Sequence, residues 1–254
     1  MQNKWTDEQL QQAFYLYCVL PFGKLHSKTP SIIALAQRIG RTPSAVAMKL
    51  VNFASLDPAI TGTGRKGLSG ASAGDKKVWA QFHDDWAGLV EKCTALDLAL
   101  NDPMLALDND IEFNTPSTKI GLDILRETKV RIGQQFFRQS ILANYKNKCC
   151  ITGLDLPTLL VASHIKPWSQ DFANRLNPSN GLCLSNLHDK AFDQGFISLD
   201  KNYCIMVSAR IKQSENPFML EAIANFEGKQ ITFPEKFAPN ALFIQHHRES
   251  VFKP

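Results

Sequence analysis

Two histidines and an asparagine lie close together in the second half of the sequence: His164, Asn180 and His188. Histidine changes its charge near neutral pH, so it can take a proton from water or bind a metal ion as neutral imidazole. An asparagine side chain both donates and accepts hydrogen bonds, so it can hold such a ring or its backbone. Together these residue types can support proton transfer beside a metal ion, provided that the fold brings them together.

The residues around them predict a β-loop-β-α unit. Residues 159–161 are apolar and predict a short strand, which the Lys-Pro pair at 166–167 ends. A polar loop leads to Asn180, and residues 181–184 predict a second strand. Ser185 is suited to cap a following helix. One histidine would then lie on the first strand, the asparagine at the start of the second strand, and the other histidine on the helix.

This ordered set resembles the ββα-metal motif of His-Asn-His (HNH) endonucleases. SHIKPW corresponds to the His-Ile-x-Pro element, NGLCLS to the Asn-Leu-x-x-Leu element, and LHDKAFDQG to the closing histidine. The FD-x-G ending is similar to a subfamily associated with restriction enzymes. So are RIGQQFFRQSILANYKNKCCITGL upstream and FEGKQITFPEKFAPNALFIQHHRESVF downstream. Each piece alone is weak, but the ordered set is specific; it covers about half of the chain.

The resemblance implies hydrolysis of phosphodiester bonds with a divalent metal ion. Mg²⁺ is the expected ion, and Mn²⁺ or another divalent ion is the alternative. His164 is implied as the general base that takes a proton from water, and Asn180 as the residue that holds the base or its backbone. His188 is implied as a metal ligand on the helix, where the ion offsets charge on the scissile phosphate and on the departing oxygen.

The sequence departs from the commonest pattern of that family in two ways. Ser163 stands where many relatives have an Asp or His metal ligand, so the second ligand must come from elsewhere. We expect Asp193, at the end of the helix, to replace it, and Asn186 is a weaker candidate. The zinc-binding cysteines of many relatives are also missing, because the run that starts at Cys150 ends in Gly153. Packing rather than zinc should therefore hold this fold together.

The charge distribution of the rest of the chain indicates a polyanionic partner. The formal net charge is only +4, yet Asp57 is the sole acid from residue 9 to residue 74. A second basic run, over residues 126–148, follows an acidic stretch at 97–112. Basic segments of this kind suit a nucleic acid, although two solvated faces would give the same composition. In the first segment the basic residues are Lys24, Lys28, Arg38, Arg41, Lys49, Arg65 and Lys66.

Helical patterns fill the N-terminal part. Hydrophobic spacing predicts helices over residues 5–20, 31–39 and 75–92, with a further helix that begins at Thr42-Pro43. A helix, a glycine-containing turn and a second helix resemble a helix-turn-helix, a motif that also occurs in proteins that never touch DNA. The loop at residues 61–74 holds five glycines together with two basic residues. It is either a flexible surface loop or one whose bare backbone can approach DNA closely.

Part of this region, TPSAVAMKLVNFASLDPAITGTGRKGLSGAS, loosely resembles the recognition domain of McrA-type modification-dependent restriction endonucleases. The matching pieces are KLVNF and GRKGLS. The resemblance implies double-stranded DNA with methylated or hydroxymethylated cytosine as the partner, read by a surface that includes Lys49, Arg65 and Lys66. Arg131 and Arg138 lie at helical spacing in the second basic run, where they either contact phosphate or belong to a solvated or ion-paired face.

We therefore expect an α+β protein with a mainly helical DNA-binding domain and a C-terminal ββα-metal (HNH) nuclease domain. The expected boundaries are 1–95 for the first domain, 96–118 for a linker and 119–254 for the nuclease domain. The N-terminus is polar and no apolar stretch could span a bilayer, which favours a cytoplasmic protein with no membrane partner. Cutting both strands usually needs two active sites, so a homodimer is the expected assembly for that activity.

Two other hypotheses remain open from the sequence. The first is a DNA-binding protein with an inactive nuclease fold, which Ser163 keeps open. The second is a non-specific effector nuclease, which would have a secretion or partner domain in place of a basic DNA-reading domain. Cleavage of DNA with and without a divalent ion separates the first hypothesis from an active nuclease.

Overall fold

The computed structural model of the chain describes residues 4–62, 70–83, 85–95, 121–169 and 171–254. Arg65, Lys66 and the expected linker at 96–118 lie outside these residues. The chain divides into two compact units, Met1–Ser140 and Ile141–Pro254. Among the helices described, none is long and apolar enough to cross a membrane.

The first unit is helical wherever its structure is described. Helix α1 (Asp7–Val19) begins at Thr6, whose hydroxyl and backbone N–H both exchange hydrogen bonds with the residue three positions later. Helices α2 (Pro30–Arg38) and α3 (Pro43–Ala54) each begin with a proline, which has no N–H to leave unbonded at this position. Gly40, with φ of +65°, makes the turn between them. Two helices joined by a glycine-containing turn, as the sequence predicted, are thus present.

The expected helix over residues 75–92 consists of two helices. They are α5 (Ala73–His83) and α6 (Trp86–Ala95). Short helical turns lie earlier in the chain, η1 at Phe22–Lys24 and α4 at Pro58–Thr61.

Helix α1 forms the centre of this unit. It packs against α2, α3, α5 and α6, and every residue in its last ten positions is buried. The ring of Phe14 lies 5.1 Å from that of Phe53, 5.5 Å from that of Trp79 and 5.9 Å from that of Trp86, centroid to centroid. Aromatic rings that pack in this way contribute beyond the area that they bury. The helices of the first unit therefore share one aromatic core.

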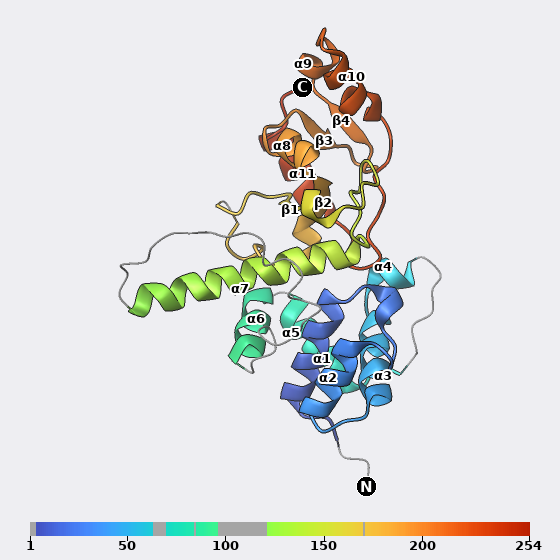
Figure 1. Ribbon diagram of the computed structural model, residues 1–254, viewed down its shortest axis with the longest axis vertical. Helices are drawn as coiled ribbons and strands as arrows, with labels where there is room; N and C mark the ends of the chain where they lie inside the picture. Colours follow the sequence, from blue (N-terminus) through green and yellow to red (C-terminus); the bar gives the residue numbers. More distant parts are fainter. Residues whose placement is uncertain (1–3, 63–69, 84, 96–120, 170) are drawn as a thin grey trace. The chain divides into compact units, whose positions relative to one another are not determined.

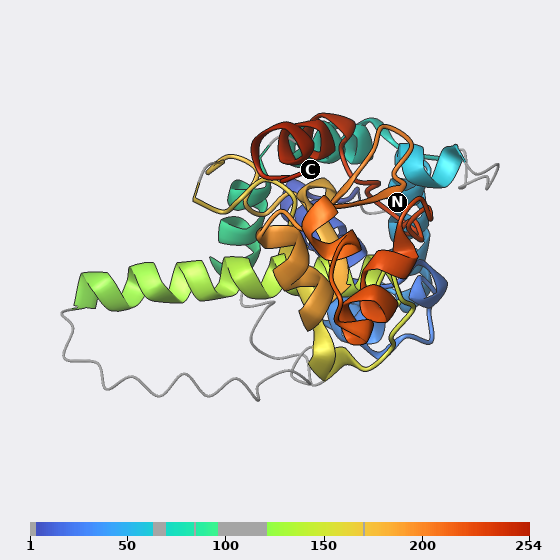
Figure 2. The same cartoon turned by 90° about the horizontal axis from the view of Figure 1, so that it is seen from above.

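Helix α7 (Gly121–Asn144) is one uninterrupted helix in both views (Figures 1 and 2). Its turns up to Ser140 belong to the first unit. The ring of Phe136 lies 5.1 Å from that of Tyr15, and the Ser140 hydroxyl donates to the Cys18 carbonyl over 3.2 Å. The division between the units consequently falls inside the helix, whereas the sequence led us to place it before the helix.

The second unit contains the expected β-loop-β-α arrangement. Strands β1 (Leu160–His164) and β2 (Gly181–Ser185) are antiparallel, and α8 (Asn186–Asp193) follows β2 directly (Figure 1). A second antiparallel pair, β3 (Ile197–Leu199) and β4 (Ile205–Val207), forms a separate sheet. Helix α8 packs against β1, β2 and β3. The two small sheets and the helices that surround them give the mixed helix and sheet organisation that the sequence predicted.

A buried histidine connects α8 with the C-terminal helix α11 (Ala241–Ser250). The ring of His247 stacks on that of Phe192 with their centroids 3.6 Å apart. Its Nε2 donates to the Phe192 carbonyl over 3.1 Å, and its Nδ1 lies 2.9 Å from the Ser198 hydroxyl. Both ring nitrogens are therefore hydrogen-bonded while the imidazole is neutral, and the ring holds α8, β3 and α11 together.

The FD-x-G element ends in a glycine for a steric reason. Gly195 has φ of +73°, and a Cβ at this position would overlap the backbone carbonyl of Val251. The Gly195 carbonyl also accepts a hydrogen bond from the Lys253 N–H over 2.9 Å. The chain segment after α11 thus packs directly against this turn, which leaves no room for a side chain.

The cysteines of the chain do not form disulfides. All six cysteines of the chain are free thiols, and five of them are buried. Burial raises the pKa of the Cys150 thiol well above its ordinary value, so this thiol is packed rather than reactive.

The remaining elements of the second unit are short. They are η2 (Pro157–Leu159), η3 (Pro178–Asn180), α9 (Ala209–Lys212), α10 (Pro217–Ala222) and η4 (Ala224–Phe226).

Candidate active site

The end of β1 and the start of β2 lie side by side and bring two of the expected site residues together. In the antiparallel register, His164 pairs with Gly181. The Ile165 N–H donates to the Asn180 carbonyl over 2.9 Å. His164 and Asn180 are thus placed next to each other by backbone pairing, although a long loop separates them in sequence.

The imidazole of His164 is held through one of its nitrogens. Its Nε2 lies 2.9 Å from the backbone carbonyl of Arg175. A carbonyl only accepts hydrogen bonds, so Nε2 carries the proton and Nδ1 is the basic nitrogen of the neutral ring. Burial lowers the pKa of His164, and the positive charge of Arg175 adds to this effect, while the hydrogen bond to the carbonyl opposes it. The ring is therefore oriented and kept neutral at pH 7, as a general base requires.

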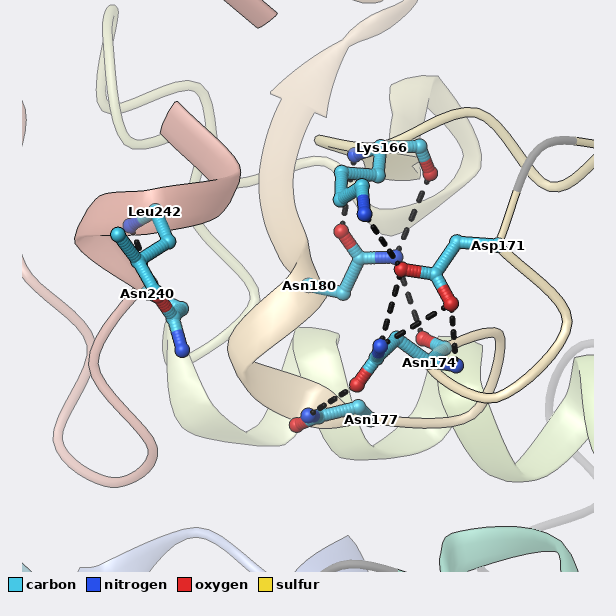
Figure 3. Close-up of polar contacts among 7 residues, drawn as sticks. All are labelled: Lys166, Asp171, Asn174, Asn177, Asn180, Asn240 and Leu242. Carbon is cyan, nitrogen blue, oxygen red and sulfur yellow. Dashed lines mark hydrogen bonds and ion pairs between the residues drawn. The ribbon is translucent and has the colours of Figure 1, made fainter. Parts of the chain in front are cut away.

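Asn180 holds the backbone around the histidine. Its Oδ1 accepts from the Lys166 N–H over 2.9 Å. Its Nδ2 donates to the carbonyls of Lys166 and Asn174 over 3.3 and 3.1 Å (Figure 3). The side chain is 1% exposed, so these bonds are sheltered from water. Of the two roles that the resemblance leaves open, the geometry places Asn180 on the backbone that follows the histidine and not on its ring.

The loop at residues 166–180, which we call the site loop, is stiffened by further polar contacts. The Lys166 ammonium lies 2.7 Å from an oxygen of Asp171, and the Asn174 side chain donates to both oxygens of Asp171 over 3.0 and 2.9 Å (Figure 3). Burial alone would raise the pKa of Asp171, but the hydrogen bonds from Lys166 and Asn174 outweigh it and lower that pKa. Asn177 extends the network to Asn174 over 3.1 Å. The loop is therefore built to hold its shape.

His188 is buried on α8, with one ring nitrogen hydrogen-bonded and the other without a hydrogen bond of ordinary geometry. The residue is 3% exposed. Its Nδ1 is 2.8 Å from the Ser185 hydroxyl, and the Phe226 ring meets its ring edge to face at 5.4 Å. Burial lowers the pKa of His188, and the nearby backbone of Ala222 raises it by less. Its Nε2 is buried and makes no hydrogen bond of ordinary geometry. The ring thus packs inside the unit, beside the residue that caps α8.

The next residue on α8, which the sequence analysis did not single out, faces the end of β1. The carboxylate of Asp189 lies close enough to the Ser163 hydroxyl for that group to lower its pKa, although burial has the larger and opposite effect. The hydroxyl is buried and makes no hydrogen bond of ordinary geometry, so the two groups are neighbours rather than a bonded pair. Helix α8 therefore presents Asp189 to the strand that carries the histidine base.

Asp189 and Asp193 form a pair of carboxylates on one face of α8. Residues four positions apart lie on the same side of a helix. Burial raises the pKa of Asp193, and the negative charge of Asp189 raises it further, while Lys190 acts against both. Neither carboxylate belongs to an ion pair among the described residues. Asn186, the weaker candidate, lies exposed at the start of the helix. The spacing of two acids by one helical turn was the available sequence signal for this pair.

This pair fits a divalent cation in its chemistry. The two carboxylates have raised pKa values and form no ion pair among the described residues, so a metal ion bound there would offset their negative charge. Within the described part of the chain, His, Cys, Asp and Glu side chains do not gather in threes around a common point. Mg²⁺ is commonly held by one or two carboxylates, with water and substrate phosphate completing its coordination. The carboxylate pair therefore suits an ion of that kind better than it suits zinc.

The structure revises one of the expected DNA contacts. Lys49 is 9% exposed, and its ammonium lies 2.9 and 3.0 Å from the two oxygens of Asp75, which is fully buried. A cation that is paired inside the fold cannot reach a phosphate, so Lys49 stabilises α3 against α5 instead. Most of α3 is buried as well, which leaves little of this helix to lie in a DNA groove. Arg131 on α7 is exposed and Arg138 partly so; both remain candidates.

Comparison with known families agrees with the geometry of the second unit. Residues 149–200 match the family model described as HNH endonuclease. The match begins just before η2 and ends after β3, so it contains β1, the site loop, β2 and α8. This segment is therefore similar to HNH endonuclease domains, which generally use a divalent metal ion and act on DNA. Residues 1–148 and 201–254 lie outside the match. A search among curated proteins gave no match to the chain.

Proposed function

We propose that this protein is a metal-dependent endonuclease that hydrolyses phosphodiester bonds in double-stranded DNA. The observation that carries the proposal is the His164 ring at the end of β1. It is oriented through Nε2 and kept neutral by its surroundings, inside a segment that matches the HNH endonuclease family. In this role His164 takes a proton from the attacking water at Nδ1.

The other residues of the site position this base. Asn180 fixes the backbone on both sides of the loop, at Lys166 and Asn174. The loop in turn supplies the Arg175 carbonyl that orients the ring. An error of about 1 Å in the position of a catalytic group can cost roughly a hundredfold in rate. The buried hydrogen bonds of Asn180 are therefore a positioning device for His164.

We assign the metal ion to Asp189 and Asp193 rather than to His188. The two carboxylates share a face of α8, and Asp189 lies beside the residue that precedes His164. A divalent ion bound there would stabilise negative charge on the phosphate and on the leaving oxygen. His188 keeps the role that its contacts give it, which is to pack against Phe226 and hydrogen-bond Ser185, the N-cap of the helix.

The biological role that we favour is that of a restriction endonuclease. It is supported by the resemblance of the C-terminal half to a restriction-associated HNH subfamily and by the basic composition of the N-terminal half. On this proposal the enzyme is cytoplasmic, works as a homodimer when it cuts both strands, and recognises methylated or hydroxymethylated cytosine. With Lys49 buried, the recognition surface would have to use Arg65 and Lys66 together with basic residues that are exposed elsewhere in the chain.

The test is cleavage of supercoiled plasmid by the full chain in Mg²⁺ or Mn²⁺, and in EDTA. We expect nicking or linearisation with the ions and none in EDTA. His164→Ala should lower the rate by roughly 10²–10⁴-fold because the general base is lost. His246→Ala is the matched control, since it removes a histidine of α11 that lies outside the site. No cleavage with any divalent ion, or an unchanged rate in His164→Ala, would refute the proposal.

Paired plasmids test the finer part of the proposal. We expect faster cleavage of a plasmid that carries methylated or hydroxymethylated cytosine than of the same plasmid without modification. One buried methyl group is worth only about 0.8 kcal/mol, roughly a fourfold preference, so a larger ratio would require additional contacts. Equal rates on both plasmids would leave the nuclease assignment intact and exclude dependence on modified cytosine.

A further inference from the structure

One large apolar side chain of the site loop projects into solvent. Phe172 is 70% exposed. A single exposed apolar residue is ordinary on a protein surface, but this one stands on a loop that ion pairs and amide hydrogen bonds hold in shape. An apolar ring that is both exposed and rigidly supported is suited to contact something outside the chain.

An arginine stacks on this ring and holds it in place. The guanidinium carbon of Arg175 lies 3.5 Å from the centroid of the Phe172 ring and 4.9 Å from the centroid of the Trp168 ring. Its Nε donates to the Trp168 carbonyl over 2.8 Å. We call Trp168, Phe172 and Arg175 the arginine–aromatic stack. It combines a flat apolar surface with a fixed positive charge.

The stack is joined to the general base. The backbone carbonyl of Arg175 is the acceptor for His164 Nε2 at 2.9 Å. The Trp168 ring also meets the His164 ring edge to face, with centroids 5.3 Å apart. Whatever the stack contacts therefore lies close to the atoms that would be cleaved.

We infer that Phe172 is a wedge that inserts between neighbouring base pairs of double-stranded DNA beside the scissile phosphate, an inference that rests on the proposed function. Apolar side chains such as Phe open and kink base steps in this way, and a base presents the flat π-face that an aromatic ring needs. The Arg175 charge, on the same support, suits the phosphates on either side of the opened step.

The surroundings favour DNA over a protein partner. Asp171 is the one acid in the sequence of the site loop, and its charge is neutralised by Lys166 at 2.7 Å. Among the described charged residues of the loop, Arg175 therefore keeps a positive charge that no acid of the loop offsets. A protein interface would call for a contiguous apolar patch at its centre. In the described part of the site loop, however, Phe172 is the only large apolar side chain that is mostly exposed.

The first experiment measures DNA unwinding and needs neither cleavage nor a known target sequence. Nicked plasmid is closed by ligase in the presence of Mg²⁺ and the full-length chain carrying His164→Ala, which should cut roughly 10²–10⁴-fold more slowly. A wedge unwinds the duplex, so we expect the topoisomer distribution to shift as protein is added. Adding Phe172→Ala should remove most of this shift, whereas Phe172→Trp should retain it.

The control is a second exposed phenylalanine of the same unit. Phe218 on α10 is 61% exposed and lies outside the site loop, so Phe218→Ala should leave the topoisomer shift intact. In chains with an intact His164, Phe172→Ala should lower plasmid cleavage roughly tenfold, as expected for the loss of one stacking contact. Phe218→Ala should leave the cleavage rate unchanged.

The outcomes separate the two proposals. No cleavage by the wild-type chain together with a Phe172-dependent topoisomer shift would refute the nuclease function and keep the wedge. Cleavage together with a shift that is absent, or that persists in Phe172→Ala, would refute the wedge and keep the nuclease. The wedge would also be refuted if Phe218→Ala lost the shift to the same extent, since the effect would then be one of general surface hydrophobicity. Melting temperatures of all variants verify that each chain is folded.

Discussion

Helices α3 and α8 offer a comparison between two ways in which a charged side chain can sit in this protein. Both helices begin at a hydroxyl-bearing cap, Thr42 in α3 and Ser185 in α8. In α3 the charged residue that we expected at the surface, Lys49, is buried against Asp75 at 2.9 Å. In α8 the partly buried Asp189 forms no ion pair among the described residues, and its neighbour on that face is another acid.

The difference shows that the residue next to a charged side chain, and not the net charge of the surrounding segment, decides whether that side chain is available to bind a ligand. The basic stretch over residues 9–74 ends one residue before Asp75, and that acid takes the charge of Lys49. A satisfied buried ion pair is inert toward ligands. Asp189 and Asp193 form no such pair among the described residues, and carboxylates with shifted pKa values are typical of functional sites.

Removing one partner of the buried pair should have the largest effect in this comparison. Lys49→Met should lower the free energy of unfolding by about 3–5 kcal/mol, since it leaves the Asp75 charge buried alone. Urea unfolding measures this, and Lys76→Met, at an exposed lysine on α5, should change stability by less than about 0.5 kcal/mol. DNA binding lost in Lys49→Met with stability unchanged would return Lys49 to the DNA-reading surface.

The buried histidine of α11 should make stability depend on pH. Burial lowers the pKa of His247 to about 4, and the charge of His246 adds to this effect, from an ordinary value of 6.5. His247 then binds a proton more readily in the unfolded chain than in the folded one. Its neutral form therefore contributes fully to the free energy of unfolding above about pH 6.5, and this contribution is lost as the pH falls toward 4. The loss amounts to roughly 3 kcal/mol, at about 1.4 kcal/mol per unit.

The measurement is the free energy of unfolding as a function of pH. His247→Gln should be less stable at pH 7 and should flatten the profile between pH 6.5 and 4, because the titrating group is absent. His246→Gln is the matched control and should keep most of the slope. A wild-type profile that is flat over this range would contradict the lowered pKa.

The carboxylates of α8 should affect the metal requirement. Asp189→Asn and Asp193→Asn should each raise the Mg²⁺ concentration needed for half-maximal cleavage, by about 10–100-fold. His188→Asn should instead lower the melting temperature and leave the metal requirement nearly unchanged, since the ring packs against Phe226. The opposite pattern, with the metal requirement sensitive to His188 and insensitive to both acids, would restore the ligand first expected from the sequence.

The smallest effect concerns a surface charge. Arg131 is exposed on α7, so Arg131→Gln should lower the slope of log binding constant against log salt by about one unit if the side chain contacts a phosphate. Lys77→Gln is the control, since Lys77 is already paired with Asp7. Identical slopes in the two variants would make Arg131 part of a solvated face.

The sequence by itself determined the ββα unit. Its strands and the start of its helix follow from local patterns, which are the apolar runs and the serine before the helix. The same patterns place His164 at the end of β1 and Asn180 directly before β2. Such features depend on neighbours in the sequence or on strand pairing, which local patterns specify.

Only the tertiary structure decided where the side chains of α8 lie. His188 and Asp189 are adjacent, so they point in directions about 100° apart around the helix axis. The packing of α8 against β1, β2 and β3 buries His188 and brings Asp189 near Ser163. The pairing of Lys49 with Asp75 and the hydrogen bond between His164 and Arg175 are likewise contacts across long stretches of chain. No local pattern encodes them, because each depends on where packing places a distant partner.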